Sequence, residues 1–594
     1  MGNLRISMTK AARLSMVAMT VLLIASTSSP ATRITAPDLT GLWTARLRFG
    51  PDVRGTLRLI RSGSDWRADL SGYSVPARFT AGAISFALPD GKGSFRGRVR
   101  GGRIDGQWVQ QVTNATGTAF STPVTLRPEG ANQWKGEVVP LDDVFTAYLD
   151  LKRRPDGAYS TYLRNPERNI GRFIPVTRLE LSGATVRLFG NRAGQPERVQ
   201  AEGTYDSANA IMTLPINGAT LDFTRDSDAN SAFYPRGKSP ERYHYSPPLQ
   251  IGDGWPVATP EEVGISRTGL EKLVQMLIDM PMDSLGAPQF HSVLIGRHGK
   301  LVLEEYFHGY DRDTPHDLRS ASKSWTAVLI GAAMQAGIPI RLDTPVYATM
   351  LGQVPPDLDA RKRAMTLEHL ISMTAGYDCD ERTPNAPGQE DIMQQQTEEP
   401  NWYRYTMNVR LISEPGEKIV YCSIEPNLAG GMLQKIAGER LPELFDRLVG
   451  QPLQMSTYHL FLTPTGDAYG GGGHRFLPRD FLKLAQLMLN DGRWGNRQIM
   501  SKEWSRKSGA ALRNLSSVQQ YGYLWNSLEF PWNGKKVRGY FAGGNGGQVF
   551  MGIPDLDLVV AFTGGSYADN PATFYSSRQV LPNFVLPAIN EESH

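Results

Sequence analysis

Short stretches of alternating apolar and polar residues, separated by glycine, dominate the chain from about residue 38 to residue 225. Residues 55–60 (Gly-Thr-Leu-Arg-Leu-Ile) and 177–181 (Thr-Arg-Leu-Glu-Leu) are typical of this pattern. A period of two with frequent turn residues predicts antiparallel strands whose alternate side chains face a core. We therefore expect an all-β region that is either closed into barrels or stacked as sandwiches.

The β region also looks duplicated. Segments 41–43 (Gly-Leu-Trp) and 106–108 (Gly-Gln-Trp) are loosely echoed by 134–137 (Trp-Lys-Gly-Glu) and 203–205 (Gly-Thr-Tyr). Each unit has about 90 residues, the size of a small barrel or sandwich. The pattern predicts two tandem β modules, and the proline-punctuated polar stretch behind them has the composition of a linker. The predicted boundaries are 38–128 and 132–228 for the modules and 229–258 for the linker.

Beyond the linker the pattern changes to longer strands and to apolar residues at helical spacing. Two apolar runs between residues 291 and 306 predict one hairpin, and two more between residues 548 and 562 predict another. The apolar positions from Trp325 to Ala333 predict a helix that ends at Gly337. Residues 259–594 are therefore expected to form an α+β domain with an antiparallel sheet and a substantial helical part.

The N-terminus has the layout of a secretory signal peptide. An apolar run at residues 14–25 follows Arg5, Lys10 and Arg13 and precedes small residues up to Ala31. We predict that residues 1–31 direct export to the periplasm or outside the cell. An uncleaved membrane anchor remains the alternative, and no other stretch is long and apolar enough to span a bilayer.

The composition indicates which classes of partner are not expected. The 594 residues include 40% hydrophobic and 21% charged residues, and the net charge is only +4. Such a balance is typical of globular domains and shows no basic stripe for nucleic acid, so no nucleic-acid partner is expected. The nine histidines have no metal-ligand spacing, and we expect neither a metal nor a cofactor. The sequence does not indicate an oligomeric state.

Only two cysteines, Cys379 and Cys422, occur in the chain. Two are too few for a disulfide scaffold or a structural zinc site. In an oxidising compartment they can pair, but two buried free thiols fit the sequence equally well.

The candidate nucleophile is Ser320, which lies where a polar loop meets the predicted helix. Lys323 follows one turn later, so its amine and the serine hydroxyl share one face. The positive end of the helix dipole favours the anion that develops after attack. Spacing alone is weak evidence, because Ser7 and Lys10 repeat it near the N-terminus.

Acyl transfer also needs a second proton-transfer group and donors for the oxyanion. Tyr421 lies on a loop that enters a predicted helix and supplies a phenol. The run 543–548 (Gly-Gly-Asn-Gly-Gly-Gln) lets backbone N–H groups approach a substrate carbonyl.

The Ser-Ala-Ser-Lys, Tyr-Cys-Ser and Gly-Gly-Asn-Gly-Gly-Gln segments, in this order, resemble the three motifs of the serine β-lactamase and penicillin-binding-protein superfamily. They are most similar to the class C β-lactamase-related serine hydrolases. Flanking segments 260–264, 369–376 and 469–473 agree, and the resemblance covers residues 259–590 but not the β modules.

The resemblance implies a role for each motif residue. Ser320 would be acylated, with Lys323 and Tyr421 as the general acid and base. Backbone N–H groups of Ser320 and Asn545 would form the oxyanion hole. If the family fold holds, both cysteines approach the wall of the site, and a disulfide beside Tyr421 is a hypothesis. The substrate-binding candidates are Ser423, Gly544 and Gln548.

Two departures from the family pattern bear on the substrate. The second motif ends in Ser423 instead of asparagine, and Ala542 stands where the third motif begins with lysine or histidine. Loss of that cation removes a charge-assisted contact to a substrate carboxylate of roughly 1.5 to 3 kcal/mol. We therefore expect an esterase or amidase for uncharged substrates, and in this respect the chain resembles the 6-aminohexanoate-dimer hydrolases.

Two alternatives remain open. A true β-lactamase or a D-alanyl-D-alanine carboxypeptidase of the penicillin-binding-protein type keeps the same motifs. A non-catalytic protein that binds through its β modules would carry the hydrolase domain as a relic.

Overall fold

A computed structural model describes residues 37–590, apart from 114–116, 169–170, 172, 193, 227–232, 238–241, 282–283 and 568–570. The predicted signal peptide, residues 1–31, lies outside the described residues. Within the described part of the chain, every helix is too short or too polar to cross a bilayer.

The first barrel consists of eight consecutive antiparallel strands. Its last strand pairs with both the first and the second-last, which closes the sheet. The inward residues of the alternating pattern, including Leu57, Leu59 and Trp108, form its core. The strands are β2 (Gly55–Ser62), β3 (Asp65–Leu70), β4 (Tyr73–Thr80), β5 (Ala83–Ala87), β6 (Gly93–Arg100), β7 (Arg103–Gln110), β8 (Phe120–Gly130) and β9 (Gln133–Val138).

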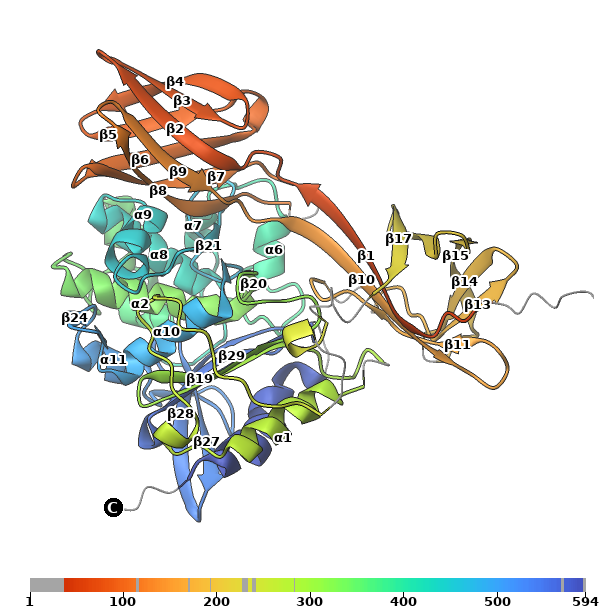
Figure 1. Ribbon diagram of the computed structural model, residues 1–594. Coiled ribbons are helices and arrows are strands. Elements are labelled where there is room, and N and C mark those ends of the chain that lie inside the picture. The colour runs from red at the N-terminus through yellow and green to blue at the C-terminus, as the bar shows by residue number, and fades with distance from the viewer. Residues whose placement is uncertain are drawn as a thin grey trace, which may run out of the picture. The chain divides into compact units, whose positions relative to one another are not determined.

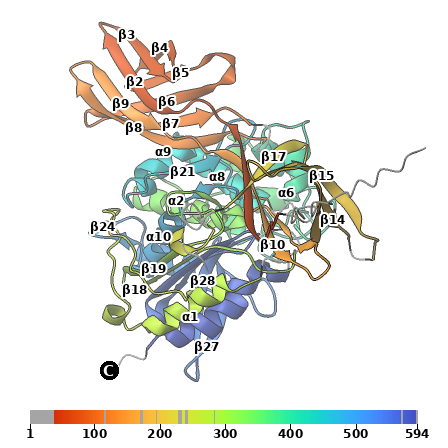
Figure 2. The same ribbon diagram turned by 45° about the vertical axis from the view of Figure 1, so that its right-hand side comes forward.

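The second barrel closes through the first strand of the chain. Strand β1 pairs with β17 on one side and with β10 on the other, and Figures 1 and 2 both show β1 running alongside β10. The strands are β1 (Gly41–Gly50), β10 (Asp143–Arg153), β11 (Tyr159–Ser160), β12 (Leu163–Arg164), β13 (Arg178–Ser182), β14 (Thr185–Gly190), β15 (Arg198–Asp206), β16 (Ile211–Ile216) and β17 (Ala219–Arg225).

The barrel boundaries therefore differ from the predicted modules 38–128 and 132–228. The first barrel spans residues 55–138, and the second combines 41–50 with 143–225. The reason is the fit of Trp43, which is fully buried among the second barrel's apolar residues and donates its indole N–H to Leu39 O at 2.8 Å. Alternation shows which face of a strand is buried, but not which sheet the strand joins.

The α+β domain is built on an eight-stranded antiparallel sheet, in the order β19-β18-β30-β29-β28-β27-β26-β25. Both predicted hairpins are confirmed, as β18–β19 and β29–β30. The strands are β18 (Phe290–Arg297), β19 (Lys300–Tyr306), β25 (Arg513–Asn514), β26 (Gln520–Tyr521), β27 (Asn526–Trp532), β28 (Lys535–Gly544), β29 (Gln548–Ile553) and β30 (Leu558–Gly564).

Helices cover both faces of this sheet (Figure 1). Helix α1 and the C-terminal helical turns at 576–588 pack on one face, while α10, α2 and α8 belong to the core on the other. The helices are α1 (Arg267–Ile278), α2 (Lys323–Gln335), α3 (Val346–Leu351), α4 (Ala360–Ala364), α5 (Leu367–Ile371), α6 (Glu390–Gln395), α7 (Trp402–Asn408), α8 (Ile424–Ala437), α9 (Leu441–Phe445), α10 (Pro478–Leu489) and α11 (Lys502–Ser508).

Short strands connect the first barrel to this domain. Strand β21 (Tyr458–Phe461) pairs with β8, so that Phe461 lies opposite Phe120, and β22 (Arg475–Phe476) and β20 (His316–Asp317) extend the same sheet. A further pair, β23 (Arg493–Trp494) and β24 (Arg497–Gln498), forms a separate ribbon. The sheet of the first barrel thus continues to the residues just before Ser320.

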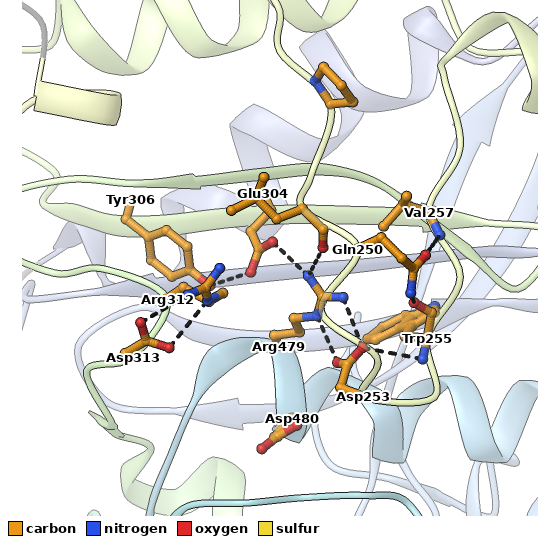
Figure 3. Close-up of polar contacts among 12 residues, drawn as sticks. Gln250, Asp253, Trp255, Val257, Glu304, Tyr306, Arg312, Asp313, Arg479 and Asp480 are labelled. Atoms are coloured by element: carbon orange, nitrogen blue, oxygen red, sulfur yellow. Dashed lines mark hydrogen bonds and ion pairs between the residues drawn. The ribbon is translucent and has the colours of Figure 1, made fainter.

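The described part of the predicted linker is packed against the α+β domain. Figure 3 shows Arg479 of α10 between two carboxylates, with Asp253 Oδ2 at 2.8 Å and Glu304 Oε2 at 2.9 Å. Arg479 also donates to Leu249 O at 3.0 Å, and Tyr245 OH donates to Val302 O at 2.7 Å. Residues 245–255 therefore contribute to the fold of the domain that they precede.

Candidate active site

Ser320 lies in a tight turn that leads into α2. The preceding residue, Arg319, has a φ of +48°, in the left-handed region that most side chains avoid. Asp317 Oδ1 accepts the Arg319 N–H at 3.0 Å, and Ser322 Oγ donates to Arg319 O at 2.7 Å. The two bonds hold the turn in this conformation and present Ser320 at the head of a buried helix.

Lys323 lies beside the serine, as its spacing in the sequence predicts. Its Nζ donates to Ser320 Oγ at 2.8 Å and lies 5.0 Å from the centre of the Tyr421 ring. Burial opposes the charge on this amine, but Tyr421, Glu390 and Glu381 outweigh burial and raise the Lys323 pKa above its ordinary value. Lys323 is therefore an ammonium at neutral pH.

Tyr421 is held on a braced loop just before α8. Its neighbour Cys422 forms a disulfide with Cys379, and its own carbonyl accepts the Glu381 N–H at 3.3 Å. The edge of its ring meets Tyr521 with the ring centres 6.3 Å apart. The sequence did not decide between a disulfide and two free thiols. In the structure the two cysteines form a disulfide.

Glu381 is an acidic residue that the sequence analysis did not identify. Its carboxylate accepts the Ser423 N–H at 2.8 Å and the Glu390 N–H at 3.0 Å. Burial raises the Glu381 pKa, while Lys323 partly opposes this effect. Neither hydrophobic periodicity nor a spacing motif marks this position, because the approach of Glu381 to Lys323 depends on the fold.

The glycine-rich run lies against the Ser320 turn. A Cβ at Gly544 would come within 2.3 Å of Leu318 O and 2.9 Å of Ala321 N, so only glycine allows β28 to approach this closely. The next residue, Asn545, lines the same cavity as Ser320.

Gln548 faces away from that cavity. Its amide donates to Gly564 O at 2.8 Å and to Asn545 O at 3.2 Å, and it accepts the Gly564 N–H at 3.1 Å. These bonds occupy its amide oxygen and nitrogen in supporting the loop around Asn545. Its contacts therefore match a structural role and differ from the predicted contact with substrate.

The cavity at Ser320 has a volume of about 490 Å³ and is lined also by Tyr421, Ser423 and Asn545. The Ser423 hydroxyl is buried and lies beside the Glu381 carboxylate, whose pKa it helps to lower. The glycine segment that resembles the family contributes Gly472 and Gly473, and the Gly473 N–H donates to Arg319 O at 3.1 Å. Four lining residues come from the β barrels or their connections: Thr118, Phe120, Glu167 and Arg168.

One group of potential metal ligands lies next to Tyr421 and includes its neighbour Cys422. Cys379, Cys422 and Glu425 bring their ligand atoms within 4.8 Å of one another. The two sulfurs are bonded to each other, however, and cannot bind a metal as thiolates.

An antiparallel sheet between helical layers, with Lys323 hydrogen-bonded to Ser320 and close to the Tyr421 ring, is the arrangement that the resemblance to the serine β-lactamase superfamily implies. The Beta-lactamase family model matches residues 286–573, so this part of the chain is similar to that family.

Solved structures are similar to about half of the chain. A Bacillus anthracis protein named as a 6-aminohexanoate-dimer hydrolase is 18% identical, with a TM-score of 0.43, over 54% of this chain and 85% of the other. The hydrolase EstCE1, described as having promiscuous acyltransferase activity, is 20% identical, with a TM-score of 0.43, over 53% and 96%. A penicillin-binding protein of Bacillus halodurans is 16% identical, with a TM-score of 0.38, over 49% and 95%.

Proposed function

We propose that the protein is an exported serine hydrolase that cleaves an ester or amide bond through an acyl-enzyme on Ser320. The observation that carries the proposal is the 2.8 Å hydrogen bond from Lys323 Nζ to Ser320 Oγ, with Tyr421 beside both groups. Nucleophilic catalysis requires a nucleophile hydrogen-bonded to an activating group within a cavity. Ser320 and Lys323 provide this arrangement at the start of α2.

The raised pKa of Lys323 favours Tyr421 over Lys323 as the group that takes the first proton. An ammonium donates a hydrogen bond and cannot accept the serine proton, so Lys323 acts by stabilising negative charge at Ser320 Oγ. Tyr421 is the proposed general base that takes that proton. The Oγ–carbon bond forms, and the bond to the leaving group then breaks as Tyr421 returns the proton to the leaving group. Water then attacks the acyl carbon as Tyr421 takes its proton, and the carbon–Oγ bond breaks as Tyr421 returns that proton to Ser320 Oγ, which releases the acid.

Backbone donors complete the mechanism. The N–H groups of Ser320 and Asn545 would bind the oxyanion, and each such donor is worth roughly 3 kcal/mol in other enzymes. The position of Gly544 against residues 318–321 supports this role. Ser423, which lines the cavity beside Tyr421, is the candidate residue for holding the substrate.

The test is covalent labelling with a fluorophosphonate, run beside a panel of p-nitrophenyl esters and a fluorescent penicillin. We expect the wild type to be labelled and to hydrolyse esters, and we expect Ser320→Ala to lose both properties. Ser62→Ala, which changes an exposed serine on β2, is the matched control and should behave as wild type. Unchanged labelling of Ser320→Ala would defeat the proposal, and efficient turnover of penicillin would favour the β-lactamase alternative.

A further inference from the structure

Three guanidinium groups line the Ser320 cavity, and they come from three separate parts of the chain. Arg319 belongs to the nucleophile turn, Arg475 to β22, and Arg168 to the second barrel just after β12. Their side chains are 45%, 20% and 41% exposed, respectively, so each is partly open to solvent and partly fixed by the protein.

Among the described residues, two carboxylates form ion pairs with these arginines. Asp317 Oδ2 serves two of them, Arg319 at 3.1 Å and Arg475 at 3.4 Å. Asp143 Oδ1 lies 3.5 Å from Arg168. Arg475 Nε is buried and has no hydrogen-bond partner among the described residues. In the part of the chain that the structure describes, these three guanidinium groups therefore form ion pairs with two carboxylates, and Arg475 Nε keeps a donor for a ligand.

A further acidic residue on this wall, Glu167, is hydrogen-bonded within the second barrel. Its Oε2 accepts N–H groups from Thr146 at 3.2 Å and from Asn165 at 2.7 Å. Burial raises the Glu167 pKa and so favours the neutral acid. The cavity has three more acidic side chains, Glu381, Glu390 and Asp391. Glu381 and Glu390 act on Lys323, and Glu390 and Asp391 act on Arg319.

Two of the arginines also line a neighbouring cavity. A second cavity, of about 670 Å³, lies between the second barrel and the α+β domain and shares Glu167, Arg168 and Arg475 with the first. A group bound at the arginines therefore has space beyond it, along the barrel.

We propose that Arg168, Arg319 and Arg475 form a subsite for a carboxylate group of the substrate, so that the second barrel helps to select what Ser320 acylates. This inference rests on the proposed function, and it replaces the expectation that the substrates are uncharged. Ala542 lacks the cation that the family motif provides and is buried within β28. The arginine subsite supplies positive charge from other segments, one of them outside the hydrolase domain. The substrate is thus a carboxylate-bearing ester or amide.

The experiment compares matched charged and neutral esters. Mono-p-nitrophenyl glutarate against p-nitrophenyl butyrate places the carboxylate on the acyl side, and 4-acetoxybenzoate against its methyl ester places it on the leaving group. We expect a higher kcat/KM for the charged member of at least one pair. Arg168→Gln and Arg475→Gln should each lower that charged-to-neutral ratio about tenfold, the effect of losing one charge-assisted contact. Arg187→Gln is the control, because Arg187 is similarly exposed and pairs with Glu202 away from the cavity.

Calorimetric binding of glutarate gives a readout that does not need turnover. Wild type and Ser320→Ala should bind it equally, and Arg168→Gln and Arg475→Gln about tenfold more weakly. Equal ratios and equal glutarate binding in all variants would overturn the subsite, even if esters are hydrolysed. Absence of all ester turnover with arginine-dependent glutarate binding would instead defeat the proposed function and leave the subsite supported.

Discussion

Lys323 Nζ donates a 2.8 Å hydrogen bond to Ser320 Oγ from a side chain that is only 1% exposed. A charge at this depth is unfavourable unless it is compensated. Tyr421, Glu390 and Glu381 provide the compensation, and the pKa of Lys323 is raised in spite of burial. The pair is therefore maintained by acidic groups that lie far from the Ser-Ala-Ser-Lys motif in the sequence.

Replacing Lys323 tests this electrostatic role. Lys323→Met removes the ammonium while keeping much of the volume, and we expect kcat for ester hydrolysis to fall about 10²-fold to 10⁴-fold, within the range of positioned proton-transfer and charge groups. Stopped-flow assays over pH 6 to 11 measure the effect. Because the ammonium is the active form and its pKa is raised, wild-type activity should fall only as pH rises above the ordinary lysine range. An alkaline limb that is identical in Lys323→Met would contradict the role.

Gly544→Ala tests the close approach of β28 to the nucleophile turn. The added methyl would lie 2.3 Å from Leu318 O, so the strand or the turn must move. We expect kcat/KM to fall about 100-fold, comparable to the loss of one oxyanion donor. Gly286→Ala is the control, because a Cβ there meets no atom within 4 Å. Equal activity of the two variants would show that the contact does not position the site.

Much of this architecture could be predicted from the chain, and the failures have a common cause. Alternation predicted the strands, and the order of three motifs brought Ser320, Lys323 and Tyr421 together. The pattern could not assign β1 to the second barrel, because alternation is independent of strand partner. It also did not predict that Arg168, some 150 residues before Ser320, lies in the cavity. Such contacts depend on how separate sheets pack, which local sequence does not encode.

The disulfide between Cys379 and Cys422 should support both stability and activity. It closes a loop with a sequence separation of 43 residues, for which chain entropy gives about 4 kcal/mol. We expect the double variant Cys379→Ser/Cys422→Ser to lose about this much free energy of unfolding in urea titrations. Its kcat should also fall, because Tyr421 adjoins Cys422.

Reduction of the wild type distinguishes the effect of losing the disulfide from other effects of the two substitutions. Dithiothreitol should lower the stability of the wild type towards that of the double variant and should leave the double variant unchanged. A wild type that keeps its stability and kcat after full reduction, verified by mass spectrometry, would contradict this prediction.

Arg479 should be essential to the attachment of residues 245–255 (Figure 3). It is 2% exposed and neutralises Asp253 and Glu304, with Lys483 as a second cation 3.3 Å from Asp253. Arg479→Ala leaves buried negative charge uncompensated, and we expect a loss of about 3 to 5 kcal/mol in the free energy of unfolding. Arg341→Ala, which breaks an exposed pair with Asp343, should cause no measurable change in urea titrations. Similar losses in both variants would contradict the special role of burial.

Buried histidines should make the folded protein sensitive to acid. Burial lowers the pKa of His459 to about 3, and the same cause acts on His316, to about 4, and on His474, to about 3. The unfolded chain binds protons at these sites below about pH 6.5, while the folded chain does not, so stability falls as pH decreases from 6.5 towards 4. Each histidine contributes about 1.4 kcal/mol per pH unit.

His459→Gln isolates one of these contributions. His459 Nδ1 lies 2.7 Å from Thr122 Oγ1 of the first barrel, and glutamine can keep a hydrogen bond there without titrating. We measure the free energy of unfolding by urea titration between pH 4.5 and 7. We expect it to decline less steeply with decreasing pH in the variant than in the wild type, by the slope that corresponds to about one proton. Because the comparison uses slopes, a uniform destabilisation of the variant does not affect it, whereas parallel slopes would show that His459 does not remain neutral in the folded protein.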